Sequence, residues 1–131
     1  MPGRNQFSYA LYRLVPDLER GERLNVGVIV FSRPLDFLGA RTHLDEERVA
    51  AVAPEFDPKP VRPQLLAIER IASGSPDGGP IAGLDSTARF HWLTAPSSTV
   101  VRSSAVHTGL CEDPERVLDE LFRTLVLTQR G

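Results

Sequence analysis

The hydrophobic pattern of the chain centres on one short apolar run, residues 24–31. Only Asn25 and Gly27 interrupt a series of Leu, Val, Ile and Phe there, and such residues favour a pleated strand. Strand side chains alternate between two faces, which predicts Leu24, Val26, Val28 and Val30 on one face and Asn25, Gly27, Ile29 and Phe31 on the other. Because the second face is also apolar from Ile29 to Phe31, we expect an internal strand covered on both sides at that end.

Asn25 and Gly27 are the two exceptions in this strand, and the alternation puts both on the second face. Glycine inside a strand marks a bulge or a close approach by another group. A buried asparagine needs hydrogen-bond partners. The favoured interpretation is that Asn25 bonds a neighbouring loop while Gly27 makes room for a helix. The alternative is that the pair forms the floor of a small pocket.

Three further segments have strand character: residues 6–15, 37–43 and 99–106. In the first, Tyr9, Leu11, Arg13 and Val15 share one face, and a short charged hairpin over 18–23 should pair it antiparallel with the central strand. A turn at 33–36 leads into the second, which completes a meander. The third is rich in Val, Ser and Thr and should add an edge strand.

Helical periodicity and end signals predict four helices, beginning near residues 45, 63, 85 and 113. Asp45 and the Asp113-Pro114 pair are helix-start signals, and Gly74 is placed to cap the second helix. The last helix is the best defined, since Leu118, Leu121 and Leu125 recur at helical spacing. The third segment stays open, because residues 90–93 fit a strand as well as a helix.

The elements together predict an α+β fold: an antiparallel sheet of about four strands with three to four helices packed mainly on one face. The length of 131 residues suits a single domain spanning 1–131. Residues 54–63 form a proline-rich connector. Residues 73–83 form a flexible loop rich in Gly, Pro and Ser, which lacks the Gly-Lys-Ser/Thr ending of a phosphate-cradling loop.

Composition and charge describe an ordinary soluble protein. Hydrophobic residues make up 41% of the chain, and no apolar stretch approaches a membrane span. One cysteine, Cys111, excludes an intrachain disulfide and suits a reducing cytoplasm. Because 17 acidic residues outnumber 15 basic ones, nucleic acid is an unfavoured partner.

The sequence contains little that indicates a catalytic site or a metal site. His107 and Cys111 are the only His/Cys pair at a ligand-like interval, and a zinc site needs three or four protein ligands. Ser103, Ser104 and Cys111 lie near His107 in sequence, but nothing resembles a strained nucleophile turn. We therefore expect no catalytic set, no metal and no cofactor. Residues 107–111 are interpreted instead as a loop that closes onto the last helix, with Gly109 at positive φ.

Charged residues in strands offer the remaining candidates. Arg13, Arg41 and Arg102 would form a basic spot for phosphate or an acidic partner if their strands are neighbours; otherwise each covers apolar surface with its stem. The carboxylates Asp17, Glu19 and Glu22 fit a solvated turn, with Glu22 nearest the covered strand. The candidate binding residues are Arg13, Glu22, Asn25, Arg41 and His107.

Two segments resemble the bacterial family called domain of unknown function 3037. The first joins Tyr12-Arg13, Val15-Pro16-Asp17 and Gly21-Glu22 to Asn25-Val26-Gly27-Val28-Ile29-Val30-Phe31, and the second is Val106-His107-Thr108-Gly109-Leu110 with Asp113-Pro114. The likeness covers essentially the whole chain. It implies a small cytoplasmic protein of unassigned activity with an accessory role beside a HipA-like kinase, and it supplies no catalytic residues.

Three functions follow as hypotheses. The first is a non-enzymatic interaction module, a partner of a kinase-like protein, that uses residues 73–83 or the edge strand at 99–106 as its contact. The second is a small-ligand or phosphate-binding protein, with enzymatic activity left open, whose Arg13, Glu22, Asn25 and His107 converge in one cleft. The third, nucleic-acid binding, is the least favoured. Self-association stays open.

Overall fold

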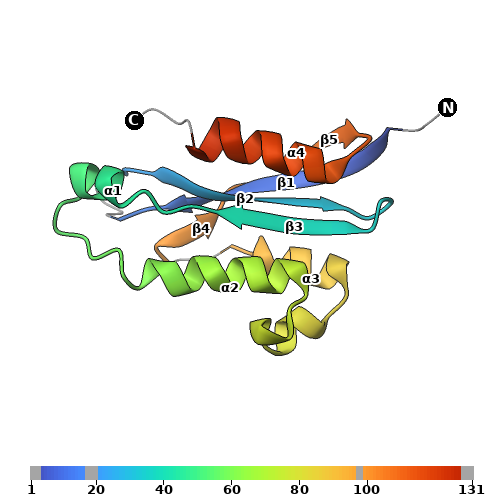
Figure 1. The fold of residues 1–131 in the computed structure, drawn as a ribbon, viewed down its shortest axis with the longest axis horizontal. Helices are drawn as coiled ribbons and strands as arrows, with labels where there is room; N and C mark the ends of the chain where they lie inside the picture. The colour runs from blue at the N-terminus through green and yellow to red at the C-terminus, as the bar shows by residue number, and fades with distance from the viewer. Residues whose placement is uncertain (1–3, 17–20, 97–98, 128–131) are drawn as a thin grey trace.

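The computed structural model describes residues 4–16, 21–96 and 99–127. Strands β1 (Asn5–Leu14), β2 (Leu24–Ser32) and β3 (Phe37–Thr42) form the predicted antiparallel meander. The sheet order is β3-β2-β1-β4, so β2 is internal. Figure 1 shows the long strands crossing the middle of the molecule. The hairpin predicted at 18–23 falls largely on residues 17–20, which lie outside the described residues.

The edge beside β1 differs from the prediction for residues 99–106. Strand β4 covers only Val101–Ser103, and the chain pairs with β1 again as β5, His107–Cys111. Residues 107–111 are therefore a strand rather than the predicted loop, and Gly109 does not have positive φ. Between the two strands Ser104 keeps contact with β1, because its backbone N–H donates to Leu11 O and its hydroxyl accepts from Leu11 N.

A β-bulge in β2 changes the predicted faces of the central strand. Tyr12 pairs with Gly27 but Arg13 pairs with Asn25, which leaves Val26 as the extra residue. The prediction that residues 24, 26, 28 and 30 share a face is wrong for this reason. Leu24, Val26, Ile29 and Phe31 face one core, whereas Val28 and Val30 face the other.

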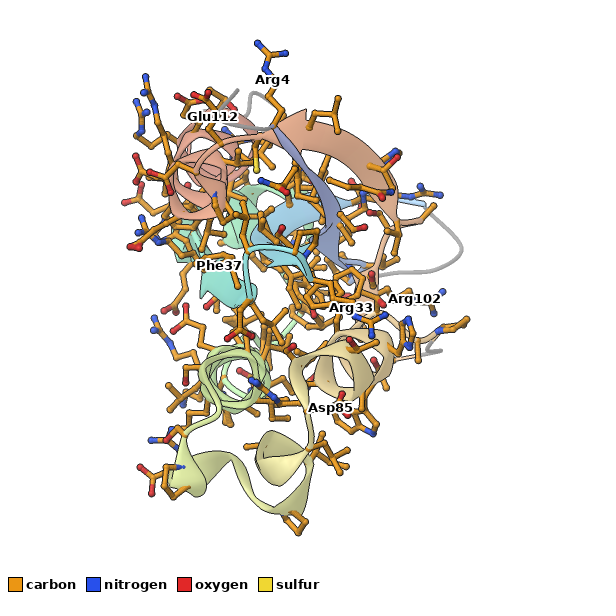
Figure 2. All side chains as sticks on the ribbon, turned by 90° about the vertical axis from the view of Figure 1, so that its right-hand side faces the viewer. Arg4, Arg33, Phe37, Asp85, Arg102 and Glu112 are labelled. Carbon is orange, nitrogen blue, oxygen red and sulfur yellow. The ribbon has the colours of Figure 1, made fainter. Side chains whose placement is uncertain are left out.

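Helices cover both faces of the sheet, so the prediction that they pack mainly on one face is not confirmed. Helices α2 (Val61–Ser73) and α3 (Ser86–Leu93) lie on one side, and α4 (Pro114–Leu121) with the π-helical turn η3 (Phe122–Leu127) lies on the other. Figure 2, an end-on view, shows α2 and α3 side by side with the sheet between them and α4. The physical cause is the doubly buried β2, because each of its faces needs an apolar cover.

The helix-start predictions are confirmed by the caps. The carboxylates of Asp45, Asp85 and Asp113 each accept from backbone N–H groups at the starts of α1 (Glu46–Val52), α3 and α4. Residues 86–93 are thus a helix, whose Phe90 stacks on Phe31 of β2 with ring centroids 4.8 Å apart.

The predicted end of α2 and the loop that follows it agree only in part with the structure. Gly74 caps α2 with φ 73°, as predicted. Within the segment 73–83, which was predicted as a flexible loop, the structure shows two short 3-10 helices, η1 (Pro76–Gly78) and η2 (Pro80–Gly83). Within the described residues, no helix is long and apolar enough to cross a membrane.

Gly27 lies where neighbouring groups leave little room for a side chain. A Cβ placed there would lie 3.0 Å from Thr42 Cγ2, 3.1 Å from the Arg41 carbonyl oxygen and 3.4 Å from Tyr12 Cδ2. The glycine therefore makes room for strand β3 and the Tyr12 ring, not for a helix. Gly83 offers a matched contrast, because a Cβ there would meet nothing within 4 Å.

We predict that Gly27→Ala lowers the free energy of unfolding by about 1–2 kcal/mol, because the backbone of β3 must shift to admit the methyl group. Gly83→Ala should change it by less than about 0.5 kcal/mol. Urea denaturation of both variants measures the difference. Equal stability of the two variants would contradict the close approach at Gly27.

Candidate functional site

Two arginines lie directly opposite each other at the sheet edge. Arg13 of β1 pairs with Arg102 of β4 in the antiparallel register, so their Cβ atoms are about 4.5–5.5 Å apart on one face. Figure 2 labels Arg102, which comes from the edge strand. Arg13 and Arg102 are both half-buried. Like charges in this position repel each other, which makes the pair an unusual choice at a strand edge.

A third arginine, Arg23, lines a cavity together with this pair. Arg13, Arg23 and Arg102 line a hollow of about 230 Å³ together with Val15, Gly21 and Ser103, and we call it the arginine pocket. Gly21 has φ 70°, and a Cβ placed on it would meet no atom within 4 Å, so the turn stays open beside the cavity. The Arg102 Nε–H donates to the Thr99 carbonyl at 2.7 Å, which orients that guanidinium.

The chemistry of the arginine pocket suits an anion. Guanidinium groups are planar donors that bind phosphate and carboxylate in a bidentate manner. None of the described lining residues is a carboxylate, a histidine or a cysteine. The pocket can therefore bind and orient a negative group. Its one described hydroxyl, on Ser103, donates to the Ser104 carbonyl, and no described lining residue beside it is a carboxylate or histidine that could activate it as a nucleophile.

Asn25 is the cross-strand neighbour of Arg13, but its side chain is engaged in a hydrogen bond within the fold. Its Nδ2 donates to the Leu125 carbonyl in η3 at 2.9 Å, which ties the end of β2 to the C-terminal segment. Because of the bulge, Asn25 follows the face of Arg13 while Gly27 follows the face of Tyr12. The premise that Asn25 and Gly27 share a face is therefore wrong, and the pair does not form one pocket floor.

The other predicted binding residues are spread out. His107 pairs with Tyr9 and packs on its ring, with centroids 5.2 Å apart. Tyr9 and Arg13 are four residues apart on β1, which is about 13 Å along a strand. Glu22 is half-buried and does not line the arginine pocket. The structure thus brings Arg13 and Asn25 together but places His107 elsewhere.

Arg41 does not join the basic spot. It lies on β3, two strands away from β1, and its Nη1 forms an ion pair with Asp119 Oδ1 of α4 at 2.8 Å. Both side chains are more than 40% exposed, so solvent screening keeps the contribution of this pair to stability small. The predicted cluster of Arg13, Arg41 and Arg102 is replaced by Arg13, Arg23 and Arg102.

His107 and Cys111, the candidates for metal binding and nucleophilic attack, lie at opposite ends of strand β5. His107 and Cys111 are four residues apart on β5, and no group of three or more potential ligands occurs among residues 4–16, 21–96 and 99–127. Burial, and then the nearby charge of Asp113, raises the pKa of the Cys111 thiol. Since the thiolate is the reactive form, Cys111 is a poor nucleophile.

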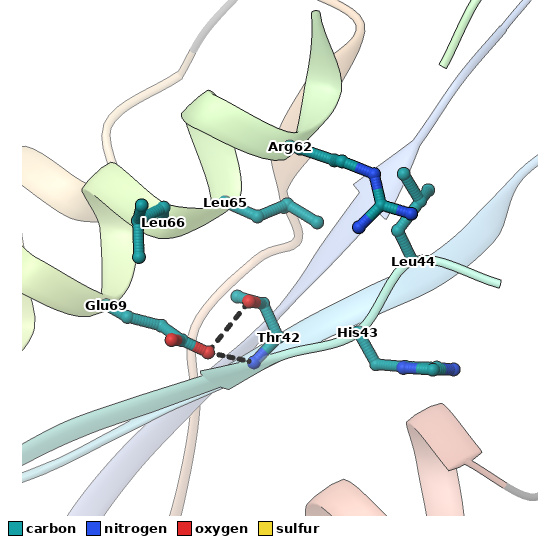
Figure 3. A pocket seen from close by; sticks show the side chains of 7 residues that line it. All are labelled: Thr42, His43, Leu44, Arg62, Leu65, Leu66 and Glu69. Carbon is teal, nitrogen blue, oxygen red and sulfur yellow. Dashed lines mark hydrogen bonds between the residues drawn. The ribbon is translucent and has the colours of Figure 1, made fainter. Parts of the chain in front are cut away.

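A second hollow, of about 410 Å³, lies between α2 and the end of β3 (Figure 3). Glu69 Oε2 accepts from both the backbone N–H and the hydroxyl of Thr42, each at 2.8 Å. Arg62 at its rim is ion-paired with Glu46. The carboxylate therefore fastens α2 to the outer strand β3. Sequence reasoning missed Glu69, although its position four residues after the buried Leu65 places it on the inner face of α2.

Comparison with known proteins identifies a family. A family model described as "Protein of unknown function (DUF3037)" matches residues 9–126. No curated protein and no solved structure matches the chain. The matched range includes every residue that lines the arginine pocket.

Tyr12 of β1 has a buried hydroxyl whose pKa is shifted from its usual value. Its side chain is 3% exposed, its hydroxyl donates to the Leu93 carbonyl at 2.9 Å, and burial raises its pKa well above the usual value. The phenol contributes stability that is fully present below its unfolded pKa of about 10. That contribution is lost as the pH rises from there towards the raised folded pKa.

We predict that the free energy of unfolding falls by about 1.4 kcal/mol per pH unit above pH 10 through Tyr12 alone. Tyr12→Phe should be less stable than the native chain by about 1–2 kcal/mol at pH 8, because the Leu93 carbonyl loses its donor. This difference in the free energy of unfolding between the native chain and Tyr12→Phe should narrow as the pH rises from about 10 to about 11.5. Urea denaturation at each pH measures it, and a gap independent of pH would contradict the role given to Tyr12.

Proposed function

The chain belongs to the DUF3037 family of proteins of unknown function, and we propose that it is a binding module rather than an enzyme. The resemblance seen in the sequence is confirmed by this match, which covers most of the chain. The module holds an anionic group of a partner in the arginine pocket. The observation that carries this proposal is the convergence of Arg13, Arg23 and Arg102 on one cavity.

An anion offsets the repulsion within this cluster. Arg13 and Arg102 face each other across one strand pair, where like charges destabilise the sheet. A phosphate or carboxylate between the guanidinium groups converts that repulsion into charge-assisted hydrogen bonds. Three cations favour phosphate, because its several acceptor oxygens can serve more than one arginine at a time.

The surroundings of the pocket favour a protein as the carrier of this anion. Arg102 lies on the same sheet edge as β5, and within the described residues the outer side of that edge has no strand partner. Leu110 on β5 is 63% exposed and Val106 is 43% exposed. A peptide added along an exposed edge gains backbone hydrogen bonds and apolar contacts at the same time.

The partner that we propose is the HipA-like kinase that the family resemblance implies, in the cytoplasm. A kinase carries phosphoryl groups on its nucleotide and on its own phosphorylated side chains, and either would present the required charge. The edge of β4 and β5 would supply the protein contact, and the arginine pocket would supply selectivity for the phosphorylated form. This assigns an accessory role to the chain.

We predict that inorganic pyrophosphate binds at low ionic strength and that Arg13→Gln and Arg102→Gln each weaken the binding about tenfold, since each removes a charge-assisted hydrogen bond. Titration calorimetry at about 10 mM and about 150 mM salt measures the affinity. The higher salt should also weaken binding, because the Debye length falls from about 30 Å to about 8 Å.

Arg33→Gln is the control for these variants, because Arg33 is an exposed arginine on the β2–β3 turn that does not line the arginine pocket. It should bind pyrophosphate as the native chain does. Equal weakening by all three substitutions would show a diffuse charge effect and would refute the assignment of a site.

We also predict that the chain co-purifies with its HipA-like kinase and that Leu110→Ser weakens the complex by about tenfold or more, because an exposed leucine that becomes buried contributes about 1.5–3 kcal/mol. Leu66→Ser is the matched control, since Leu66 is a comparably exposed leucine on α2. Pull-down from cells that express both proteins measures retention. Failure of the unaltered pair to co-elute would remove this partner from consideration.

A further inference from the structure

A neutral cavity lies on the opposite side of the sheet from α4. It measures about 420 Å³ and opens between α2, the end of α3 and strand β4. Most of its lining is apolar, with Ile68 and Ile71 from α2, Leu93 from α3 and Val101 from β4. We call it the α2–β4 cavity. Its size falls within the range of small-molecule sites in proteins, about 300–1,000 Å³.

Its lack of charge distinguishes this cavity from other hollows in the described part of the chain. The arginine pocket contains Arg13, the hollow in Figure 3 contains Glu69, and a further hollow beside the β2–β3 turn contains Arg33. No described residue that lines the α2–β4 cavity is charged. Because a charged ligand would lose its hydration there without gaining a counter-charge, the cavity suits a neutral molecule.

The hydroxyl groups in the lining, unlike the amide of Gln64 and the indole of Trp92, are turned into acceptors by their own hydrogen bonds. The hydroxyls of Tyr12, Thr99 and Ser103 donate to the carbonyls of Leu93, Val101 and Ser104 at 2.9, 2.8 and 2.9 Å. A hydroxyl has one hydrogen, so towards a ligand each of these groups can act only as an acceptor. A ligand that matches them carries an O–H or N–H donor.

An aromatic surface stands at the rim. Trp92 lines the cavity and its side chain is 53% exposed. Tryptophan combines a large apolar face with a preference for offset or edge contacts with other rings. A flat ring system in the cavity would cover part of this exposed indole and of the aliphatic wall formed by α2.

We propose that the α2–β4 cavity binds a neutral, flat, aromatic small molecule that bears one hydrogen-bond donor. This site lies apart from the arginine pocket and does not depend on the function proposed for it. The donor bonds one of the lining hydroxyl oxygens, and the ring system packs between Trp92 and Ile68. The aliphatic wall supplies most of the affinity, and the donor supplies selectivity.

Two probes of similar shape test this proposal: 2-naphthol, which has a donor, and 2-methoxynaphthalene, which lacks one. We expect saturable binding of 2-naphthol below about 1 mM and binding of the ether about fivefold weaker, since it loses one hydrogen bond. Calorimetry measures both affinities. The chain has one tryptophan, so its single indole N–H signal in an NMR spectrum reports contact at the rim, and it should shift with 2-naphthol.

Two alanine variants locate the site. Ala67 is an exposed residue of α2 that lines the cavity, and Ala51 is an exposed helical alanine on α1 outside it. Ala67→Phe fills the cavity and should abolish 2-naphthol binding, whereas Ala51→Phe should not change it. Circular dichroism checks that both variants fold. If Ala67→Phe does not fold, Ala95→Leu provides a second filling variant, from the loop that follows α3.

Three outcomes would overturn the proposal. Unchanged binding by the folded filling variant overturns the location of the site. Equal affinity for the two probes overturns the requirement for a donor. Absence of binding by both probes overturns the proposal itself, whether or not the kinase-like partner shifts the Trp92 signal.

Discussion

The burial of strand β2 on both of its faces is the constraint on which the rest of the structure depends. Every residue from Val26 to Ser32 is buried. Antiparallel sheets commonly leave one face in water, but this sheet cannot, because its middle strand is apolar on both sides. Each face therefore needs its own helical layer. Helices α2 and α3 supply one, and α4 with η3 supplies the other.

The bulge at Val26 decides how this burial is distributed. One extra residue moves Val28 and Val30 to the α4 side while Leu24 and Val26 keep facing α2. The same shift directs Asn25 towards η3, where its amide holds the Leu125 carbonyl. A residue that looks like a binding candidate in the strand pattern thus becomes a fastening for the C-terminal helix. Buried polar groups need such partners.

The arginines to which we assign anion binding lie away from the strands against which α4 packs. Helix α4 packs mainly against β2 and β3, whereas Arg13 and Arg102 lie towards the opposite edge of the sheet, where β1 meets β4. Glu69 and Arg41, by contrast, are engaged by elements packed across them. Position relative to the helical layers therefore separates the candidate binding residues from the structural ones better than residue type does.

The sequence by itself determined the three long strands and the positions of most helices, because these depend on local chemistry. The run 24–31, the caps Asp45, Asp85 and Asp113, and Gly74 each act through neighbours in the chain. It also marked Arg13 and Arg102 as unusual strand residues. Residues 107–111 were misassigned to a loop, because strand β5 is held by pairing with β1, a contact about 100 residues away in sequence.

Only the tertiary structure decided which side chains meet. The bulge exchanged the faces of β2 beyond Val26, and strand order placed Arg41 away from Arg13 and Arg102 opposite it. Side-chain alternation in one strand says nothing about an inserted residue or about which strand lies beside it. The arginine pocket and the α2–β4 cavity are products of that packing, since each is lined by segments that are distant in the sequence.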